Sequence, residues 1–253
     1  MLFAGIGSVE ATSVVVHVAE NHITIAADDL ATRMYTPNRG PYAACKIVPL
    51  GRSAFAVAGN IDYRRSSPND TLANWDARAD AREAFVHHAG NLHAVAEEWA
   101  SRAAVHYSSF LEAQAGRVRE LAAANRQHVL VLGTFAGWDE HKEAILIFEW
   151  IYLDEVADVI ETRNFVLPSR TLPYTTNAMT QELIEGNSSR STRVFLNWQL
   201  ASENLPSPER GWRWLEFLIQ TTSAYDRTVG REVNVLDLTP NENANWLQNH
   251  SCR

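Results

Sequence analysis

The sequence has little cysteine. Cys45 and Cys252 are the two cysteines among 253 residues. Two cysteines are too few for a disulfide framework, and they lack the spacing of a metal site, a pattern typical of a chain in a reducing cytoplasm. Cys45 is therefore expected to fill space in the interior as a free thiol.

Long apolar runs and an excess of basic residues are also missing. No apolar run approaches the ~20 residues that cross a bilayer. Lys and Arg number 22 against 30 Asp and Glu, which gives a formal net charge of -8. Nucleic-acid binders usually carry a clustered basic face, which this composition disfavours. The sequence thus predicts a cytoplasmic protein with neither a membrane nor a nucleic acid as partner.

The length suits one large domain. A chain of 253 residues is long enough to bury most of the surface that its unfolded form exposes. Met1 to Ala11 has no positively charged start and contains Glu10, so a secretory signal is disfavoured. We expect residues 1–11 to be a propeptide and residues 12–253 to form a single domain.

Alternation of apolar and polar residues and the apolar spacing predict an α+β fold with two mainly antiparallel sheets. Expected strands cover residues 13–19, 22–28, 45–50, 53–58, 128–133, 144–148, 156–163 and 232–238. Two helices are expected between residue 76 and about residue 124, split near Gly90-Asn91, and two more at about 189–203 and 209–224. Residues 61–75 and 164–180 are expected to be long connections, and residues 137–140 a turn.

Thr12, Asp28 and Lys46 suggest nucleophilic chemistry. A threonine that becomes the first residue of a mature chain can attack a carbonyl, because the freed α-amino group, with a pKa of about 7.7–8.0, serves as its general base. Asp28 would hold Lys46 charged, and the ammonium would lower the pKa of the Thr12 hydroxyl. The backbone N–H of Gly59 is the candidate donor to the oxyanion that forms.

This run resembles the start of the proteasome β-type subunits, which are N-terminal-nucleophile (Ntn) hydrolases. Asp28 follows Thr12 by sixteen residues and Lys46 follows it by thirty-four, while Gly59 ends an Ala-x-Ala-Gly turn. The resemblance implies a divergent bacterial-type member with a four-layer αββα sandwich. It also implies a threonine peptidase whose nucleophile is exposed by autocatalytic removal of the leader.

The resemblance extends to five further positions. Asp226 matches the aspartate that orients the nucleophile, and Ser188 lies nearest to the expected supporting serine, although Asn187 stands in its place. Val229 occupies another position where the family usually has a serine. The substrate-binding positions match Thr32, Val57 and Ile61, whose apolar members favour an apolar or small residue on the acyl side of the cleaved bond.

The resemblance further implies a peptide or unfolded-protein substrate, a homo-oligomeric ring and an unfoldase partner, with no cofactor and no metal. Two alternatives stay open. Because of Asn187 and Val229, the chain is also compatible with an inactive scaffold subunit that keeps residues 1–11. A third hypothesis is an Ntn amidase that acts on a small amide. Each site residue also has an ordinary structural role, since a threonine that opens a strand is commonly only a β-branched edge residue.

Overall fold

The computed structural model describes residues 12–19, 21–31, 42–65, 72–88, 90–167, 174–177, 180, 183–184, 189–203 and 205–252. The expected propeptide, Thr32, Asn187 and Ser188 lie outside these ranges. The helices are α1 (Ala77–His87), α2 (Leu92–Ala123), the 3-10 helix η1 (Arg126–His128), α4 (Ser189–Ser202) and α5 (Ser207–Tyr225). The longer strands are β1 (Val14–Ala19), β2 (His22–Asp28), β5 (Ile47–Leu50), β6 (Ser53–Gly59), β9 (Val129–Trp138), β10 (Ala144–Asp154), β11 (Val159–Leu167), β13 (Val233–Leu238) and β14 (Asn245–Gln248).

The longer strands form two antiparallel sheets. One sheet has the order β12-β1-β2-β13-β14, in which β12 is the short strand Tyr174–Thr175, and the other has the order β11-β10-β9-β6-β5. Two small hairpins pair β3 (Leu30–Ala31) with β4 (Tyr42–Ala43), and β7 (Asp62–Tyr63) with β8 (Trp75–Asp76). The predicted α+β class with mainly antiparallel sheets is therefore confirmed.

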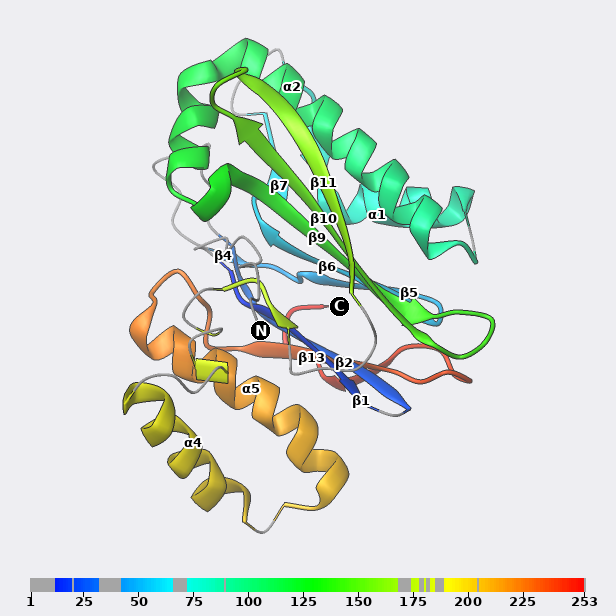
Figure 1. Cartoon of the computed structure of the whole chain (residues 1–253), viewed down its shortest axis with the longest axis vertical. Helices are drawn as coiled ribbons and strands as arrows, with labels where there is room; N and C mark the ends of the chain where they lie inside the picture. The colour runs from blue at the N-terminus through cyan, green and yellow to red at the C-terminus, as the bar shows by residue number, and fades with distance from the viewer. Residues whose placement is uncertain are drawn as a thin grey trace.

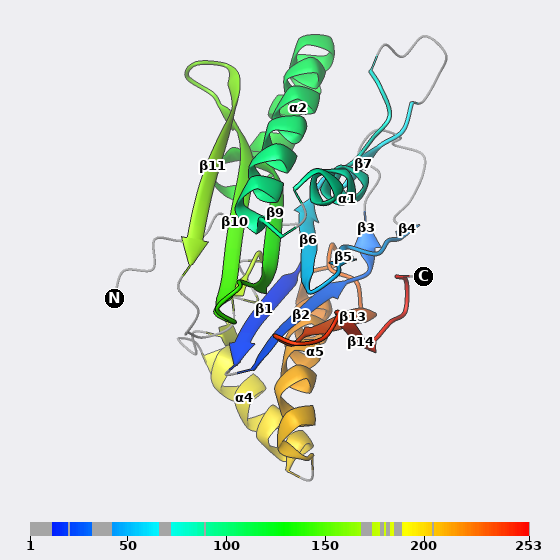
Figure 2. The same ribbon diagram turned by 90° about the vertical axis from the view of Figure 1, so that its right-hand side faces the viewer.

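The two sheets face each other, and helices cover their outer faces (Figures 1 and 2). Apolar side chains of β1 and β2, such as Val16 and Ile25, pack between the sheets against residues of β6, β9 and β10, such as Ala56 and Phe148. On the other side of the second sheet, α1 and α2 bury Trp99 and Phe110 against it. Helix α5 covers the first sheet through Leu215 and Ile219. These three apolar layers hold the two sheets together, so the end of β2 and the starts of β1 and β5 lie in fixed positions relative to one another.

Local sequence explains where the first two helices begin. The Asp76 side chain accepts a hydrogen bond from the Arg78 N–H at the start of α1, and Asn91 accepts one from Ala94 N–H at the start of α2. Such caps satisfy backbone donors that a helix leaves unpaired. The expected break near Gly90-Asn91 is therefore correct.

Several predicted boundaries were wrong. Gly137 and Trp138 belong to β9, and the turn follows them, with Asp139 Oδ1 accepting the N–H groups of His141 and Glu143. Strand β11 continues to Leu167 because it pairs with β10 along its whole length, so the connection after it is shorter than predicted. Strand β14, which pairs with β13, was not predicted. Its four residues are too few to show an apolar alternation that would mark a strand.

The expectation that Cys45 is a free packing residue was also wrong. Cys45 and Cys252 form a disulfide, with their Cα atoms 4.6 Å apart across a sequence separation of 207 residues. The C-terminal segment reaches Cys45 because buried Asn234 of β13 accepts hydrogen bonds from the N–H groups of His250 and Ser251. Two cysteines are too few to form a framework, yet they are enough for one long-range link.

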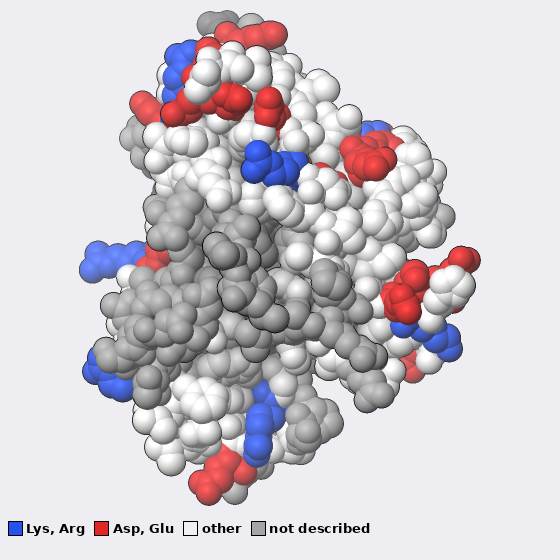
Figure 3. All heavy atoms as spheres, in the orientation of Figure 1, with Lys and Arg blue, Asp and Glu red and all other residues white. Residues whose placement is uncertain are grey.

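The surface carries mixed charge. On the face shown in Figure 3, the acidic and basic side chains of the described residues stand in small groups of both signs. None of the helices in the described ranges combines the length and the apolar character that a bilayer crossing requires.

Candidate functional site

Thr12, Asp28 and Lys46 come together at one end of the facing sheets. Thr12 precedes β1, Asp28 ends the neighbouring strand β2, and Lys46 precedes β5 of the other sheet. The Lys46 Nζ donates to Thr12 Oγ1 at 3.1 Å and to both oxygens of Asp28 at 2.9 Å. The structure therefore places the three residues in direct contact, while their catalytic roles stay predictions.

Backbone donors hold the carboxylate of Asp28 in place. Its Oδ1 accepts the Ser13 N–H at 2.8 Å, and its Oδ2 accepts the N–H groups of Leu30 at 3.1 Å and Gly230 at 2.8 Å. Position 230 requires glycine, because a Cβ there would lie 2.8 Å from the Leu30 nitrogen. Asp28 thus joins the start of β1, the end of β2 and the segment before β13.

The Lys46–Asp28 ion pair is fully withdrawn from water. Both side chains are 0% exposed, and Thr12 is 1% exposed. An ammonium has three N–H donors, and here all three have an acceptor. Burial lowers the pKa of Lys46 from its usual value, while the negative charge and hydrogen bonds of Asp28 act in the opposite direction. The pair therefore places a confined cation directly against the Thr12 hydroxyl.

A chain of buried hydroxyl groups supports the neighbouring residue, Ser13. The Ser13 Oγ lies 2.9 Å from Thr180 Oγ1, which lies 2.8 Å from Thr222 Oγ1. Thr222 donates to the carbonyl oxygen of Leu218 at 2.9 Å, and because a carbonyl only accepts, the direction of the chain is set. Ser13 donates to Thr180 and Thr180 donates to Thr222. The turn at Thr12-Ser13 is thus held by α5 as well as by Asp28.

Residues just after β12 contact the same turn. Thr176 Oγ1 accepts the Val14 N–H at 3.0 Å and lies 3.5 Å from the Thr12 carbonyl oxygen. Asn177 follows, is buried, and donates from Nδ2 to Asp226 Oδ2 at 3.4 Å. Five residues of this group were not predicted from the sequence: Ser13, Thr176, Asn177, Thr180 and Thr222. The pairing of β12 with β1 brings Thr176 and Asn177 to the site, and the short Tyr174-Thr175 strand gave no signal for it.

Asp226 lies at the edge of this group. It ends α5, and its Oδ1 accepts both the N–H and the hydroxyl of Thr228. Its described contact toward the site is Asn177, and no described hydrogen bond joins it directly to Lys46 or Thr12. The nearby Val229, where a serine was expected, is buried in the apolar core beside α5.

The predicted oxyanion and substrate residues lie on and after β6. The Val57 N–H donates to the Lys46 carbonyl oxygen at 3.0 Å, so β6 runs directly beside the lysine. Gly59 ends the strand with a φ of 89°, a conformation that favours glycine. The side chains of Val57 and Ile61 belong to the core under α2. Their roles toward a substrate stay predictions, as do those of Thr32 and Ser188, which lie outside the described residues.

The chemistry of the site is that of a hydroxyl next to a cation. Within the described ranges, no group of three or more His, Cys, Asp or Glu side chains is arranged to hold a metal ion. The arrangement offers a hydroxyl oxygen, an ammonium and a buried carboxylate in one hydrogen-bonded row. Such a row can stabilise an alkoxide that attacks a carbonyl carbon.

No family model matches the sequence, and no curated protein matches it either. Among solved structures, the chain is similar to a mutant of Anbu from Hyphomicrobium sp. strain MC1, with 13% sequence identity and a TM-score of 0.46. The match covers 95% of this chain and 90% of that chain. Likeness at this level carries no argument about activity, so the function has to be inferred from the site itself.

Proposed function

We propose that the protein is an Ntn hydrolase of proteasome-like form that cleaves peptide amides with Thr12 as its nucleophile. The observation that carries this proposal is the contact of Lys46 Nζ with both Thr12 Oγ1 and the Asp28 carboxylate. Two antiparallel sheets with helices on their outer faces fit the αββα sandwich of that class. The position of Thr12, two residues before β1, suits a residue that becomes a chain terminus.

The reaction begins with removal of the leader. Thr12 Oγ1 attacks the Ala11 carbonyl carbon, the Ala11–Thr12 C–N bond breaks, and its nitrogen takes up a proton to become the α-amine. Water then hydrolyses the resulting ester. In the mature enzyme the α-amine accepts the hydroxyl proton as Oγ1 attacks the substrate amide, and delivers it to the leaving nitrogen. A second water releases the acyl group as a carboxylic acid.

The surrounding residues have separate roles in this scheme. Lys46 stabilises the alkoxide character of Oγ1, and Asp28 keeps Lys46 charged and oriented. The Gly59 N–H is the proposed donor to the oxyanion, a contribution that is commonly worth ~3 kcal/mol.

Intact-mass spectrometry of the purified protein and of a Thr12→Ala variant tests the proposal. The wild-type chain is expected to begin at Thr12 and to hydrolyse peptide substrates. Thr12→Ala is expected to keep residues 1–11 and to lose all hydrolysis, while Thr12→Ser keeps part of both activities because it retains the hydroxyl. Hydrolysis that continues at the wild-type rate in Thr12→Ala would refute the mechanism.

The same experiment separates the alternatives. A wild-type chain that keeps residues 1–11 and cleaves nothing would indicate the scaffold subunit, for which the buried Val229 is the supporting observation. A processed chain that cleaves small amides and leaves peptides intact would indicate the amidase. Size-exclusion chromatography of the processed chain tests the proposed homo-oligomeric ring, and addition of an unfolded protein tests the substrate class.

A further inference from the structure

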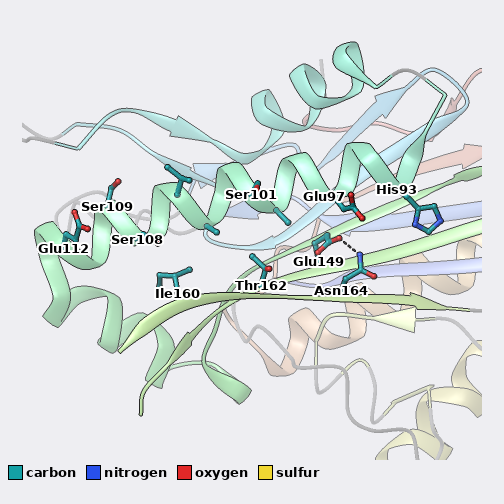
Figure 4. A pocket seen from close by; sticks show the side chains of 13 residues that line it. His93, Glu97, Ser101, Ser108, Ser109, Glu112, Glu149, Ile160, Thr162 and Asn164 are labelled. Atoms are coloured by element: carbon teal, nitrogen blue, oxygen red, sulfur yellow. Dashed lines mark hydrogen bonds between the residues drawn. The ribbon is translucent and has the colours of Figure 1, made fainter. Parts of the chain in front are cut away.

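A recess lies between α2 and the strands β10 and β11. It is a groove of about 660 Å³. One wall is a face of α2 that runs from His93 to Glu112, and the other is formed by Ile160, Thr162 and Asn164 of β11. Figure 4 shows Glu149 of β10 between the two walls, at the same end as His93 and Glu97.

Glu149 is the unusual feature of this groove. It lines the groove and is only 2% exposed. The Asn164 amide donates to its Oε1, while Oε2 has no hydrogen-bond partner among the described residues. No described Lys, Arg or His forms an ion pair with it. A buried carboxyl without a cation is costly, and native proteins normally pair such groups.

The charges that face Glu149 are of the wrong sign to stabilise it. From α2, the groove-lining groups are Glu97 and His93 at this end and Glu112 at the other. Strand β11 contributes the uncharged Thr162 and Asn164. Burial, together with the charge of Glu97, raises the pKa of Glu149 to about 7, and the hydrogen bond from Asn164 offsets this only in part. The described lining contains no Lys or Arg.

The part of the groove between Glu97 and Glu112 is lined mostly by small side chains of α2. Ala100, Ser101, Ala104 and Ser108 line it with small side chains. Glu97 and Glu112 are fifteen residues apart on α2, which corresponds to ~22 Å along a helix. A long, thin ligand with positive charge near its ends would match this pattern of an extended channel with carboxylates at both ends.

We propose that the groove binds a linear chain bearing primary ammonium groups, with one ammonium seated between Glu149 Oε2 and Glu97. The unpaired oxygen supplies the acceptor, and the carboxylates supply the charge. Such groups occur in free polyamines and in lysine side chains of polypeptides. The inference is independent of the hydrolase, because none of the groove residues contacts Thr12, Asp28 or Lys46 in any described hydrogen bond or ion pair.

Binding of a cation beside Glu149 has a proton signature. The ammonium favours the ionised carboxylate, so binding near neutral pH releases a proton from Glu149. Affinity is therefore expected to rise several-fold between pH 6 and pH 8. His93 is a second titratable group at this end, so the pH series is repeated in His93→Gln, where the rise persists if Glu149 is its source.

Isothermal titration calorimetry with spermine, and separately with an end-blocked tetralysine peptide, tests the proposal. At least one probe is expected to bind the wild-type chain, and the tighter of the two identifies the source of the ammonium. Glu149→Gln is expected to weaken binding at least tenfold and to abolish proton release, measured as the dependence of the binding enthalpy on the buffer. Glu143→Gln, an exposed change of the same charge in the β9–β10 turn, keeps wild-type affinity.

Two results would overturn the inference. If neither probe binds at millimolar concentration, the groove is not a binding site for ammonium groups. If the wild type and Glu149→Gln bind the probe with equal affinity, Glu149 is not part of the site. Thr12→Ala is expected to bind the probe as the wild type does. The groove and the proposed hydrolase can thus fail independently of each other.

Discussion

At the scale of single residues, the Lys46–Asp28 pair combines a structural and a chemical role. Two charges that are both 0% exposed are costly to remove from water, and their mutual attraction only partly offsets that cost. Asp28 also accepts three backbone N–H groups. The pair is therefore better understood as a device that positions Thr12 than as a source of net stability.

Replacing Lys46 by methionine tests whether the pair serves to position Thr12 or to stabilise the fold. The single variant Lys46→Met leaves Asp28 buried without a cation, so it is expected to lose ~3–5 kcal/mol of unfolding free energy and all self-processing. The double variant Asp28→Asn/Lys46→Met removes both charges and is expected to regain part of the stability but none of the processing. Urea denaturation and intact mass give the two readouts. If the double variant is less stable than Lys46→Met, the unpaired charge of Asp28 is not the cause of the stability lost in Lys46→Met.

Glu149 predicts an unusual pH dependence of stability. Its pKa in the folded chain is about 7, above the ordinary value of 4.5. An acid with a raised folded pKa costs no stability below its unfolded pKa, and its cost grows as the pH rises from there to the folded value. Glu149→Gln is therefore expected to stabilise the fold at pH 8, by at most ~3 kcal/mol, and to have little effect at pH 4. Melting temperatures of the two chains across pH check this, and an unchanged difference between pH 4 and pH 8 contradicts it.

At the scale of elements, α2 is fixed against its sheet by one close approach. Trp99 lies over Gly133 of β9, where a Cβ would come within 2.5 Å of the indole ring. The Trp99 Nε1–H donates to the Ala77 carbonyl oxygen at 2.9 Å, which ties α2 to α1. The glycine is thus required by the packing of a helix on a strand, and not by backbone conformation.

Alanine at two glycine positions separates packing from helix propensity. Gly133→Ala is expected to destabilise the fold by ~1–3 kcal/mol through overpacking against Trp99. Gly116→Ala, on an open part of α2 with nothing within 4 Å of the new Cβ, is expected to stabilise it by ~0.5–1 kcal/mol. Denaturant midpoints measure both. Equal effects of the same sign would exclude the Trp99 contact as the reason.

The elements with strong local patterns could be predicted from the sequence. Strands β1, β2 and β6 follow their runs of small and apolar residues, which are buried almost throughout, and α1 and α2 follow their apolar spacing and their caps. Elements that depend on partners far along the chain could not. Tyr174–Thr175 is a strand only because β1 lies beside it, and Asn245–Gln248 only because β13 does. Neither segment has a local preference strong enough to mark it.

The candidate site divides in the same way. Thr12, Asp28 and Lys46 were predicted because their residue types and spacing resemble the start of the proteasome β-type subunits. Thr180 and Thr222 are common residues whose role depends on a chain of hydroxyls that crosses from the turn at Ser13 to α5. Their sequence separation conceals them. Glu149 likewise reads as an ordinary strand residue until its burial under α2 is known.

At the scale of the whole molecule, the disulfide is a covalent constraint between distant parts of the sequence. Closing a loop with a sequence separation of 207 residues removes much of the freedom of the unfolded chain, with an upper estimate of ~5 kcal/mol in the chain-entropy description. Cys252→Ser is expected to lower the unfolding free energy by several kcal/mol. The same loss should appear in the wild type after treatment with a dithiol reductant, which then has no further effect on Cys252→Ser. A reductant effect of equal size in both chains would contradict the assignment.

The Cys45–Cys252 link also divides the residues of the candidate site between two parts of the chain. The disulfide closes the chain from β5 to the C-terminal segment into one covalent loop, and β1 to β4 lie outside this loop. Lys46 lies inside the covalent loop, whereas Thr12 and Asp28 lie outside it. Thr12 and Lys46 therefore come into contact only when β1 and β2 pack between α5 and the second sheet, so the same packing that completes the core also completes the candidate site.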